Sequence, residues 1–320
     1  MSLHTRAPSE VGPGSSERKP SKGLVARNRK TRRGTSFPYL LVLPALALFV
    51  LVIGYPFVQS LAFAFTDRSL LGTEENFVGF ENIAAFISAP SFGPILWQTI
   101  VFVGASTLGA FVVALALALA LNTRMAAVGA LRTGFLIPWI LPGVVVSFVW
   151  LWIFDTNYGV LNGAIKMFGL GEGNTNWLDS PQLAMTAIVV AKIWHSFPWM
   201  TILILAALQG VPSEVHDAAA VDGASAWKKQ IFVILPQIKP ALALTLLLET
   251  IWGLQQFEIP YVMTSGGPVG STTTFSIALY KAAFSDFDLG KAGAIGAIWT
   301  ILMSLLVAIY VVYTIKQEKD

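Results

Sequence analysis

Three ionisable side chains lie within long apolar stretches of this sequence. They are Lys192, Glu249 and Glu258. A charge at the centre of a membrane helix costs roughly 2.5–3.5 kcal/mol on insertion scales, so each should face a partner, a polar cavity or the membrane surface. We expect Glu249 near mid-membrane, in the path of a solute or at a subunit interface. Lys192 lies close to Trp194 and His195, which favours a position at the outer membrane surface over contact with a solute.

The stretch that begins at Glu249 offers the groups that bind a hydroxylated solute. Aromatic rings cover the apolar C–H faces of a sugar, while amides and carboxylates hydrogen-bond to its hydroxyls. The candidates for a substrate path are Glu249, Trp252, Gln255, Gln256, Phe257 and Glu258. A helix broken near Pro260 would expose polar groups to a passing solute. The alternative is that the two aromatic residues pack against neighbouring helices or lipid.

The residue types that enzymes use are not arranged for catalysis. Cysteine is absent, no spacing of His and acidic residues suggests a metal, and no nucleophile can be paired with a base. A phosphate-binding loop needs Gly-x-x-x-x-Gly-Lys-Ser/Thr, but the nearest stretch has Ser285 for the first glycine and Ala292 for the hydroxyl that binds Mg²⁺. We therefore expect no cofactor and no nucleotide hydrolysis on this chain.

Composition indicates that the chain lies in a membrane. Its 320 residues are 55% hydrophobic and 12% charged, with a mean hydropathy of +0.66. An ordinary soluble protein carries about 25% charged residues, and half that share cannot cover a folded globule in water. A water-soluble enzyme is therefore excluded. The predicted fold class is all-α, a polytopic membrane protein.

Six apolar segments are long enough to cross a bilayer as helices, which takes ~20 mostly apolar residues. The fifth segment is interrupted by Glu249 and Glu258. Together the six predict one membrane domain over residues 37–316. The predicted spans are residues 37–65, 94–121, 133–154, 183–208, 240–263 and 292–315.

Lys and Arg are distributed unevenly over the loops. Of the 21, sixteen fall on one side of the predicted spans and three on the other. Short loops rich in Lys and Arg stay in the cytoplasm, so both termini and the loop over residues 209–238 are predicted there. Residues 1–36 are expected to be a disordered basic tail, and residues 317–320 a short cytoplasmic C-terminus. Because the tail carries much of the basicity, the pI of about 9.1 does not indicate nucleic-acid binding.

The loop over residues 209–238 contains a run of alanines between an acidic start and a glycine. Acidic residues favour the start of a helix, and Gly223 can adopt a positive φ without steric cost. A thin helix can therefore end at Gly223, and a second can leave at an angle before Pro236 ends it. Such a helix pair could dock in a groove of another protein, or lie on the membrane surface. The residues expected to dock are Glu214, Asp217, Ala218, Ala219, Asp222, Gly223, Ala224, Leu235 and Pro236.

This loop resembles the cytoplasmic motif of permeases from binding-protein-dependent ABC importers. That motif is Glu-Ala-Ala, three residues, Gly, nine residues, then Ile-x-Leu-Pro. Asp217-Ala218-Ala219, Gly223 and Val233-Ile234-Leu235-Pro236 have the same spacing, with Asp for Glu and Val for Ile. Residues 77–82, 157–162 and 263–268, followed by Ser271 to Thr274, resemble external segments of the carbohydrate branch.

The resemblance implies a permease subunit with the transmembrane fold of type I ABC importers, similar to maltose permeases. It implies a second six-span permease subunit, two cytoplasmic ATPases that bind ATP and Mg²⁺, and an external sugar-binding protein. Each ATPase would receive one coupling helix. The subunit would lie in the cell membrane, in contact with the lipid bilayer, and would have no nucleic-acid partner.

Other functions remain open at this point. Glu249, Glu258 and Lys192 could form the relay of a self-sufficient ion-coupled transporter, or the chain could be a membrane scaffold. Related permeases for glycerol phosphodiesters or sugar phosphates are a further alternative. The predicted path is acidic, which suits neutral polyols better than anions.

Overall fold

The computed structural model describes residues 37–122 and 134–317. The predicted tail over residues 1–36 lies outside the described residues, as do residues 318–320 of the predicted C-terminus. The chain divides into two compact units, residues 1–53 and 54–320, and each is described by itself. The described part is helical, with two isolated β-bridges, which agrees with the predicted all-α class.

The first unit contains α1 (Phe37–Phe49) and most of the π-helix η1 (Val50–Gly54). Every side chain from Tyr39 to Ile53 is exposed, although the segment is apolar. An apolar helix that buries no side chain in its own chain suits a lipid environment or a partner helix. Pro44 lies inside α1, where its missing N–H removes one helical hydrogen bond.

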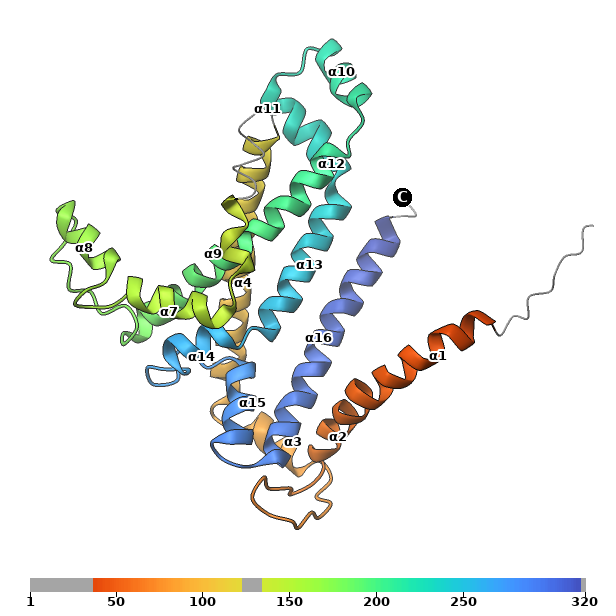
Figure 1. Ribbon diagram of the computed structural model, residues 1–320, viewed down its shortest axis with the longest axis vertical. Coiled ribbons are helices and arrows are strands. Elements are labelled where there is room, and N and C mark those ends of the chain that lie inside the picture. The colour runs from red at the N-terminus through yellow and green to blue at the C-terminus, as the bar shows by residue number, and fades with distance from the viewer. Residues whose placement is uncertain (1–36, 123–133, 318–320) are drawn as a thin grey trace, which may run out of the picture. The chain divides into compact units, whose positions relative to one another are not determined.

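The second unit is a helical bundle (Figure 1). Helices α4, α9 and α13 pack together, and α16 packs against α2, α3, α13 and α15. The elements are α2 (Tyr55–Phe63), α3 (Glu81–Ser88), α4 (Phe92–Leu121), α6 (Ile137–Ile140), α7 (Gly143–Ile153), α8 (Val160–Met167), α9 (Pro181–Gln209), α10 (Ser213–Val221), α11 (Ala226–Lys229), the π-helix η2 (Gln230–Ile234), α12 (Leu235–Gln237), α13 (Lys239–Gln255), α14 (Glu258–Thr264), α15 (Phe275–Phe284) and α16 (Leu289–Gln317).

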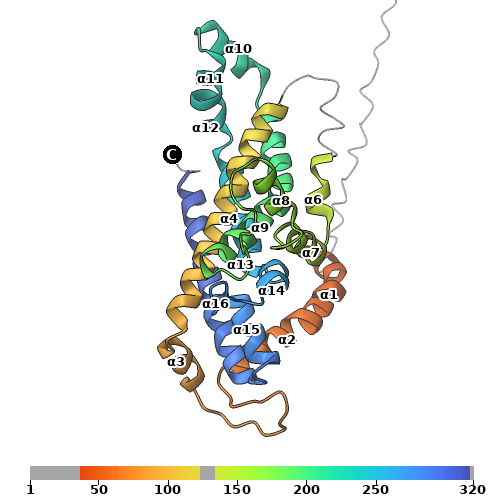
Figure 2. The same cartoon turned by 90° about the vertical axis from the view of Figure 1, so that its left-hand side faces the viewer.

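The two ends of this bundle differ. Helices α10, α11 and α12 project at the end where α16 finishes, whereas α3 and the loop before it lie at the opposite end (Figure 2). The loop at that opposite end is tied down by Asn82, whose amide donates hydrogen bonds to the carbonyl oxygens of Ala64 and Thr66 at 3.2 and 2.8 Å. The predicted coupling loop and the predicted external segment after the first span are thus at opposite ends.

Small residues bring α4 close to α9. Ala110, Ala114 and Ala118 recur every fourth residue and so share one face of α4, and all three are fully buried. They pack against larger side chains that include Met200 and Ile204 of α9. In a membrane, where lipid is as apolar as the side chains, such close van der Waals packing is what holds helices together.

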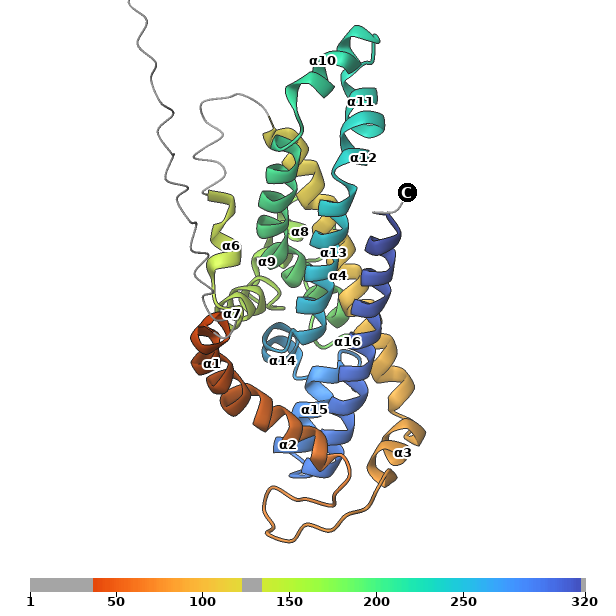
Figure 3. The ribbon, with the colours of Figure 1, turned by 90° about the vertical axis from the view of Figure 1, so that its right-hand side faces the viewer.

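Glycine plays the same part where α16 crosses α2. A Cβ on Gly293 would lie 2.9 Å from the carbonyl oxygen of Ser60 and 2.9 Å from the carbonyl carbon of Phe63. Because those atoms belong to backbone, they cannot move aside at low cost. Figure 3 shows α15 beside the first part of α16, and α16 also contacts α13.

The described residues contain four helices long and apolar enough to cross a membrane: Tyr39–Phe63, Phe92–Leu121, Pro181–Gln209 and Leu289–Val312. They correspond to the predicted first, second, fourth and sixth spans. A fifth candidate is the pair Ala226–Gln237 and Lys239–Gln255, which is bent by 70°. Six spans are therefore not confirmed.

The third predicted span, residues 133–154, is not one helix. Residue 133 lies outside the described residues, and α6 and α7 are separated at Leu141 and Pro142. Leu141 has an extended backbone, with ψ of 136°. Proline disfavours the helical conformation in the residue before it, which explains the break. Neither α6 nor α7 alone has the length of a span.

The fifth predicted span, residues 240–263, is not one continuous helix, and the expected break near Pro260 is confirmed. Helix α13 stops at Gln255, and α14 is a separate short helix. Pro260 has no N–H for the carbonyl of Gln256, four residues earlier, and its ring would clash with that carbonyl in a continuous helix. The carbonyl instead accepts a hydrogen bond from the Ser276 hydroxyl at 3.0 Å.

We predict that Gly293→Ala destabilises the protein by about 1–3 kcal/mol, because the added methyl group overpacks the contact between α16 and α2. The measurement is the free energy of unfolding in detergent. Gly104→Ala in α4 is the matched control, since a Cβ there meets nothing within 4 Å. The control should be neutral or slightly stabilising. Equal stability of the two variants would contradict the packing argument.

Candidate functional site

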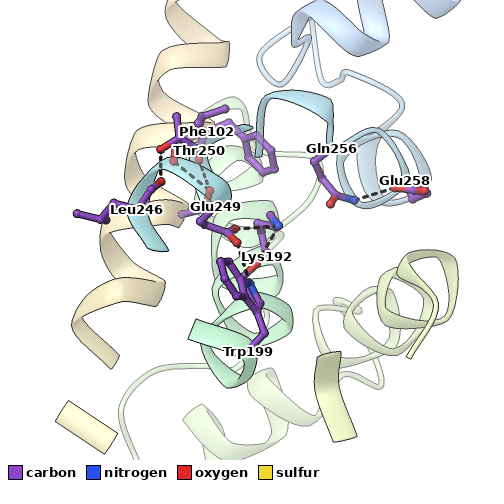
Figure 4. Close-up of polar contacts among 11 residues, drawn as sticks. Phe102, Lys192, Trp199, Leu246, Glu249, Thr250, Gln256 and Glu258 are labelled. Carbon is purple, nitrogen blue, oxygen red and sulfur yellow. Dashed lines mark hydrogen bonds and ion pairs between the residues drawn. The ribbon is translucent and has the colours of Figure 1, made fainter. Parts of the chain in front are cut away.

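A buried ion pair joins α9 to α13 in the middle of the bundle (Figure 4). The Nζ of Lys192 lies 2.9 Å from Oε1 of Glu249, and the two side chains are 4% and 0% exposed. Lys192 also donates a hydrogen bond to the Ser196 hydroxyl at 2.8 Å. Each charge thus has a partner of opposite sign, as a buried charge requires.

The second carboxylate oxygen of Glu249 accepts a hydrogen bond from Trp199. Nε1 of Trp199 donates a hydrogen bond to Oε2 of Glu249 at 3.0 Å. The Trp199 ring meets the ring of Trp252 edge to face, with centroids 4.7 Å apart and planes at 60°. Trp199 is 6% exposed, whereas Trp252 is 43% exposed. Behind an exposed aromatic ring there is thus a buried chain of polar contacts.

The helical repeat explains how the residues of these polar contacts come together. Lys192, Ser196 and Trp199 are spaced by four and three residues, so they lie on one face of α9. Glu249 and Trp252 are three residues apart on the facing helix α13. Gly253 brings α13 close to α4, because a Cβ there would lie only 3.3 Å from Cγ1 of Val103.

The expected surface position of Lys192 is wrong. Lys192 lies eleven residues after Pro181, the first residue of α9, which corresponds to about 16 Å along the helix at 1.5 Å per residue. The side chain is 3% exposed and is therefore buried inside the bundle. Burial of the charge is acceptable here because Glu249 reaches it from another helix.

The other predicted path residues follow the end of α13. Gln255 and Glu258 are exposed, and Nε2 of Gln256 donates a hydrogen bond to Oε2 of Glu258 at 2.9 Å. The ring of Phe257 stacks on Tyr261, with centroids 4.6 Å apart. In Figure 4 the Gln256 and Glu258 pair lies apart from the buried ion pair. The structure therefore separates the six candidates into a buried carboxylate, Glu249, and five residues with exposed surface.

Polar side chains also meet the break between α6 and α7. A ring nitrogen of His195, Nε2, lies 3.3 Å from the carbonyl oxygen of Leu141. Next to that break, a Cβ on Gly143 would lie 3.3 Å from Cβ of Glu258. There are two helix breaks here, one between α6 and α7 and the other between α13 and α14. Helices α7, α9 and α14 contact one another around them.

The predicted coupling loop forms a helix that ends at a glycine. Gly223 has a φ of +72°, its N–H donates to the Ala220 carbonyl at 3.1 Å, and the N–H of Ala224 donates to the Ala219 carbonyl at 3.1 Å. This pair of hydrogen bonds is a Schellman motif, which ends a helix at a residue with positive φ. A Cβ on Gly223 would meet nothing within 4 Å, so only its backbone conformation requires glycine.

The predicted docking residues are mostly on the surface of this loop. Ala219 is buried, Ala224 and Leu235 are partly buried, and the remaining six are exposed. Two large apolar side chains beside them are also exposed, Val221 by 88% and Trp227 by 68%. Apolar side chains so exposed at the end of a bundle are typical of a contact with another protein.

The second helix of the loop continues beyond Pro236, contrary to the prediction that proline ends it. The π-helix η2 precedes α12, so the wider turn accommodates the proline. The chain bends at Ile238 instead, and α13 begins at Lys239 in a new direction.

The described residues contain no group of three or more His, Cys, Asp and Glu side chains that could hold a metal. One of the segments predicted to be external has a clear structural role. The amide of Asn162 donates to the carbonyls of Thr156 and Thr175 at 3.1 and 2.9 Å, and its oxygen accepts from Nε1 of Trp177 at 3.0 Å. This asparagine therefore closes the loop between α7 and α9.

Sequence reasoning missed Trp199 and misplaced Lys192. The spacing of Lys192, Ser196 and Trp199 on one helical face was a signal that could have grouped them. Nothing local shows that this face meets Glu249, which lies 50 residues after Trp199 in the chain. Val221 was also missed, because exposure cannot be read from residue type.

Comparison with protein families gives a match over residues 112–317 to the binding-protein-dependent transport system inner membrane component. The sulfoquinovosyl glycerol transport system permease protein SmoG of Agrobacterium fabrum is 36% identical, over 85% of this chain and 88% of its own length. The trehalose/maltose transport system permease protein MalF of Thermococcus litoralis is 34% identical, over 88% of this chain and 93% of its own length.

Among solved structures, the chain resembles a bacterial ABC transporter involved in the import of the acidic polysaccharide alginate. The TM-score is 0.77 at 21% sequence identity, covering 87% of this chain and 95% of the other. This likeness shows that the chain has the transmembrane fold of ABC importers.

We predict that Lys192→Met alone lowers the free energy of unfolding in detergent by about 3–5 kcal/mol, because it leaves the Glu249 carboxylate buried and unpaired. The double variant Lys192→Met/Glu249→Gln should recover most of that loss. As control, Lys291→Met removes a pair with Asp286 that is about half exposed on both sides, and should cost at most about 1 kcal/mol. A single Lys192 variant as stable as the control would refute the buried pair.

Proposed function

We propose, from the premise that this chain belongs to the family of binding-protein-dependent transport system inner membrane components, that it forms half of the translocation path of an ATP-driven sugar importer. The observation that carries the proposal is the loop over residues 209–238, a stiff helix pair with exposed apolar side chains at one end of the bundle. Members of this family are transport subunits of the inner membrane and are not enzymes.

The loop is suited to receive an ATPase. Helix α10 is short and ends in a fixed Schellman motif. The loop exposes Val221 at the end of α10 and Trp227 in α11, together with the carboxylates of Glu214, Asp217 and Asp222. A docked ATPase could therefore bury apolar surface and pair the carboxylates. ATP and Mg²⁺ would be bound by two such cytoplasmic ATPases, and this chain would transmit the motion.

The sugar path would run past the end of α13. Trp252, Gln255, Gln256, Phe257 and Glu258 all have exposed surface and offer rings, amides and a carboxylate. Glu249 would support the path without touching the sugar, since it is fully buried. A second permease subunit would supply the other half, and an external binding protein would deliver the sugar.

The topology proposed is six crossings with both termini in the cytoplasm. The distribution of Lys and Arg supports the orientation. The third crossing would be made by α6 and α7 together, whose break is acceptable in a membrane because side chains of other helices lie beside it. The membrane domain would span residues 37–316, with the basic tail on the cytoplasmic face.

A sugar is favoured as the substrate class. The name of the relative from Agrobacterium fabrum refers to sulfoquinovosyl glycerol, a sugar linked to glycerol. The name of the relative from Thermococcus litoralis refers to trehalose and maltose. The alternative is a glycerol phosphodiester or a sugar phosphate. The charges weigh against the doubly charged group of a sugar phosphate, because Lys192 is neutralised by Glu249 while the carboxylate of Glu258 is exposed.

The transport experiment uses the complete importer in vesicles, with its partner permease, ATPase and binding protein. We expect ATP-dependent uptake of at least one of trehalose, maltose and sulfoquinovosyl glycerol, and no uptake of glucose 6-phosphate. The same chain alone in vesicles is the control and should transport nothing. Uptake by the chain alone, driven by a proton gradient, would instead support an ion-coupled transporter that uses Lys192, Glu249 and Glu258.

The glycine in the loop gives a separate test of coupling. Gly223→Pro should abolish ATP-driven uptake while membrane insertion is unchanged, because proline fixes φ near −65° and cannot form the Schellman motif. Gly223→Asn is the matched control, since asparagine tolerates a positive φ and the site has room for its side chain. It should keep most of the uptake. Normal uptake by the proline variant would contradict a coupling role for the loop.

A further inference from the structure

The buried polar chain between α9 and α13 ends at an exposed ring. We propose that Glu249 is a positioning residue for the sugar path. Its carboxylate, neutralised by Lys192, acts through Trp199 on the ring of Trp252. The proposal rests on the proposed function, because it takes Trp252 to be part of the wall of that path. Glu249 itself is 0% exposed and would not touch the sugar.

The contacts fix the carboxylate of Glu249 from two sides. Oε1 faces Nζ of Lys192 at 2.9 Å, and Oε2 accepts the N–H of Trp199 at 3.0 Å. Lys192 is in turn held by the Ser196 hydroxyl at 2.8 Å. A carboxylate bound at both oxygens by different partners has one orientation, so the indole it holds has one orientation too.

The orientation of Trp199 decides where the exposed ring of Trp252 can lie. The two ring centroids are 4.7 Å apart, and the ring planes meet at 60°, the edge-to-face arrangement that aromatic pairs favour. Trp252 follows Glu249 by three residues and so lies on the same face of α13. The exposed indole is thus supported from behind by a buried one.

Stability alone does not explain why charges are used here. Replacing a buried ion pair by apolar side chains of similar volume is often neutral or stabilising. An apolar pair, however, cannot accept the N–H of Trp199, and a buried donor without an acceptor is costly. The N–H of Trp199 therefore needs the Glu249 carboxylate as its acceptor, and the buried carboxylate in turn needs the cation of Lys192.

Two double variants separate positioning from packing and from charge. Lys192→Met/Glu249→Gln removes both charges and keeps an amide oxygen that can accept the Trp199 N–H. Lys192→Met/Glu249→Leu removes the charges and the acceptor. Both are assayed in the complete importer for uptake of trehalose, maltose and sulfoquinovosyl glycerol, beside the amount of assembled complex and its unfolding temperature.

We expect the Met/Leu variant to raise the KM for sugar uptake roughly tenfold with little change in kcat, because a badly placed ring weakens sugar binding throughout the cycle. The Met/Gln variant should restore the KM to within about threefold of the wild type, as one neutral hydrogen bond replaces a charge-assisted one. Equal KM values in both variants would overturn the proposal, since the pair would then serve packing only. Loss of transport by the Met/Gln variant would also overturn it, because the charges themselves would be required.

A second readout does not depend on the sugar. With 5-fluorotryptophan in the importer, the ¹⁹F signal of Trp252, assigned with Trp252→Phe, should be a single narrow line in the wild type and in the Met/Gln variant. It should broaden or split in the Met/Leu variant. An unchanged signal there would overturn the positioning role. If the wild type takes up none of the three sugars, the proposed function fails, and the fluorine signal alone decides whether Glu249 positions Trp252.

Discussion

A lipid bilayer offers no hydrogen-bond partners, so a chain that interrupts a helix inside it must supply them itself. This constraint governs the two breaks in the bundle. The carbonyl of Gln256 is freed where α13 ends, and the Ser276 hydroxyl donates to it at 3.0 Å. At the other break, a ring nitrogen of His195 lies 3.3 Å from the Leu141 carbonyl. Each break is therefore accompanied by a polar side chain from another helix.

The same constraint gathers the groups that can bind a polar solute. The two broken helices bring freed backbone groups close to the polar side chains of the continuous helix α9, His195 among them. Lys192 and Glu249 add a buried ion pair beside these breaks, and Trp199 and Trp252 add aromatic surface. The resulting mixture of rings and hydrogen-bonding groups is what a sugar ring requires, and an unbroken bundle would not provide it.

Sequence patterns were sufficient where one local property decides the structure. Hydropathy located four of the spans, because a long uncharged apolar segment has few alternatives to a spanning helix. The positive φ of Gly223 also follows from local preference. Patterns failed where a partner far away in the chain decides. Nothing near Lys192 shows that Glu249 neutralises it. Pro260 indicated the break after α13, but nothing near it shows that the Ser276 hydroxyl of α15 donates to the freed carbonyl. Pairing between helices is a property of the fold, and the charges could be assigned only after α9 and α13 were placed.

Helix α13 connects the predicted coupling loop to the proposed sugar path. It begins after the bend of 70° that follows the coupling loop, and it ends at the break next to Gln256. Its 17 residues cover about 25 Å at 1.5 Å per residue. A displacement of the loop would move α13 as a rigid body, since a helix transmits a shift along its axis with little compression. Glu249 and Trp252 lie in its last two turns, so the buried contacts to α9 are where that displacement would be resisted. In the proposed importer, the residues that orient the sugar are therefore also those that oppose the motion of the helix. Substrate binding and the response to ATP would then share one set of contacts.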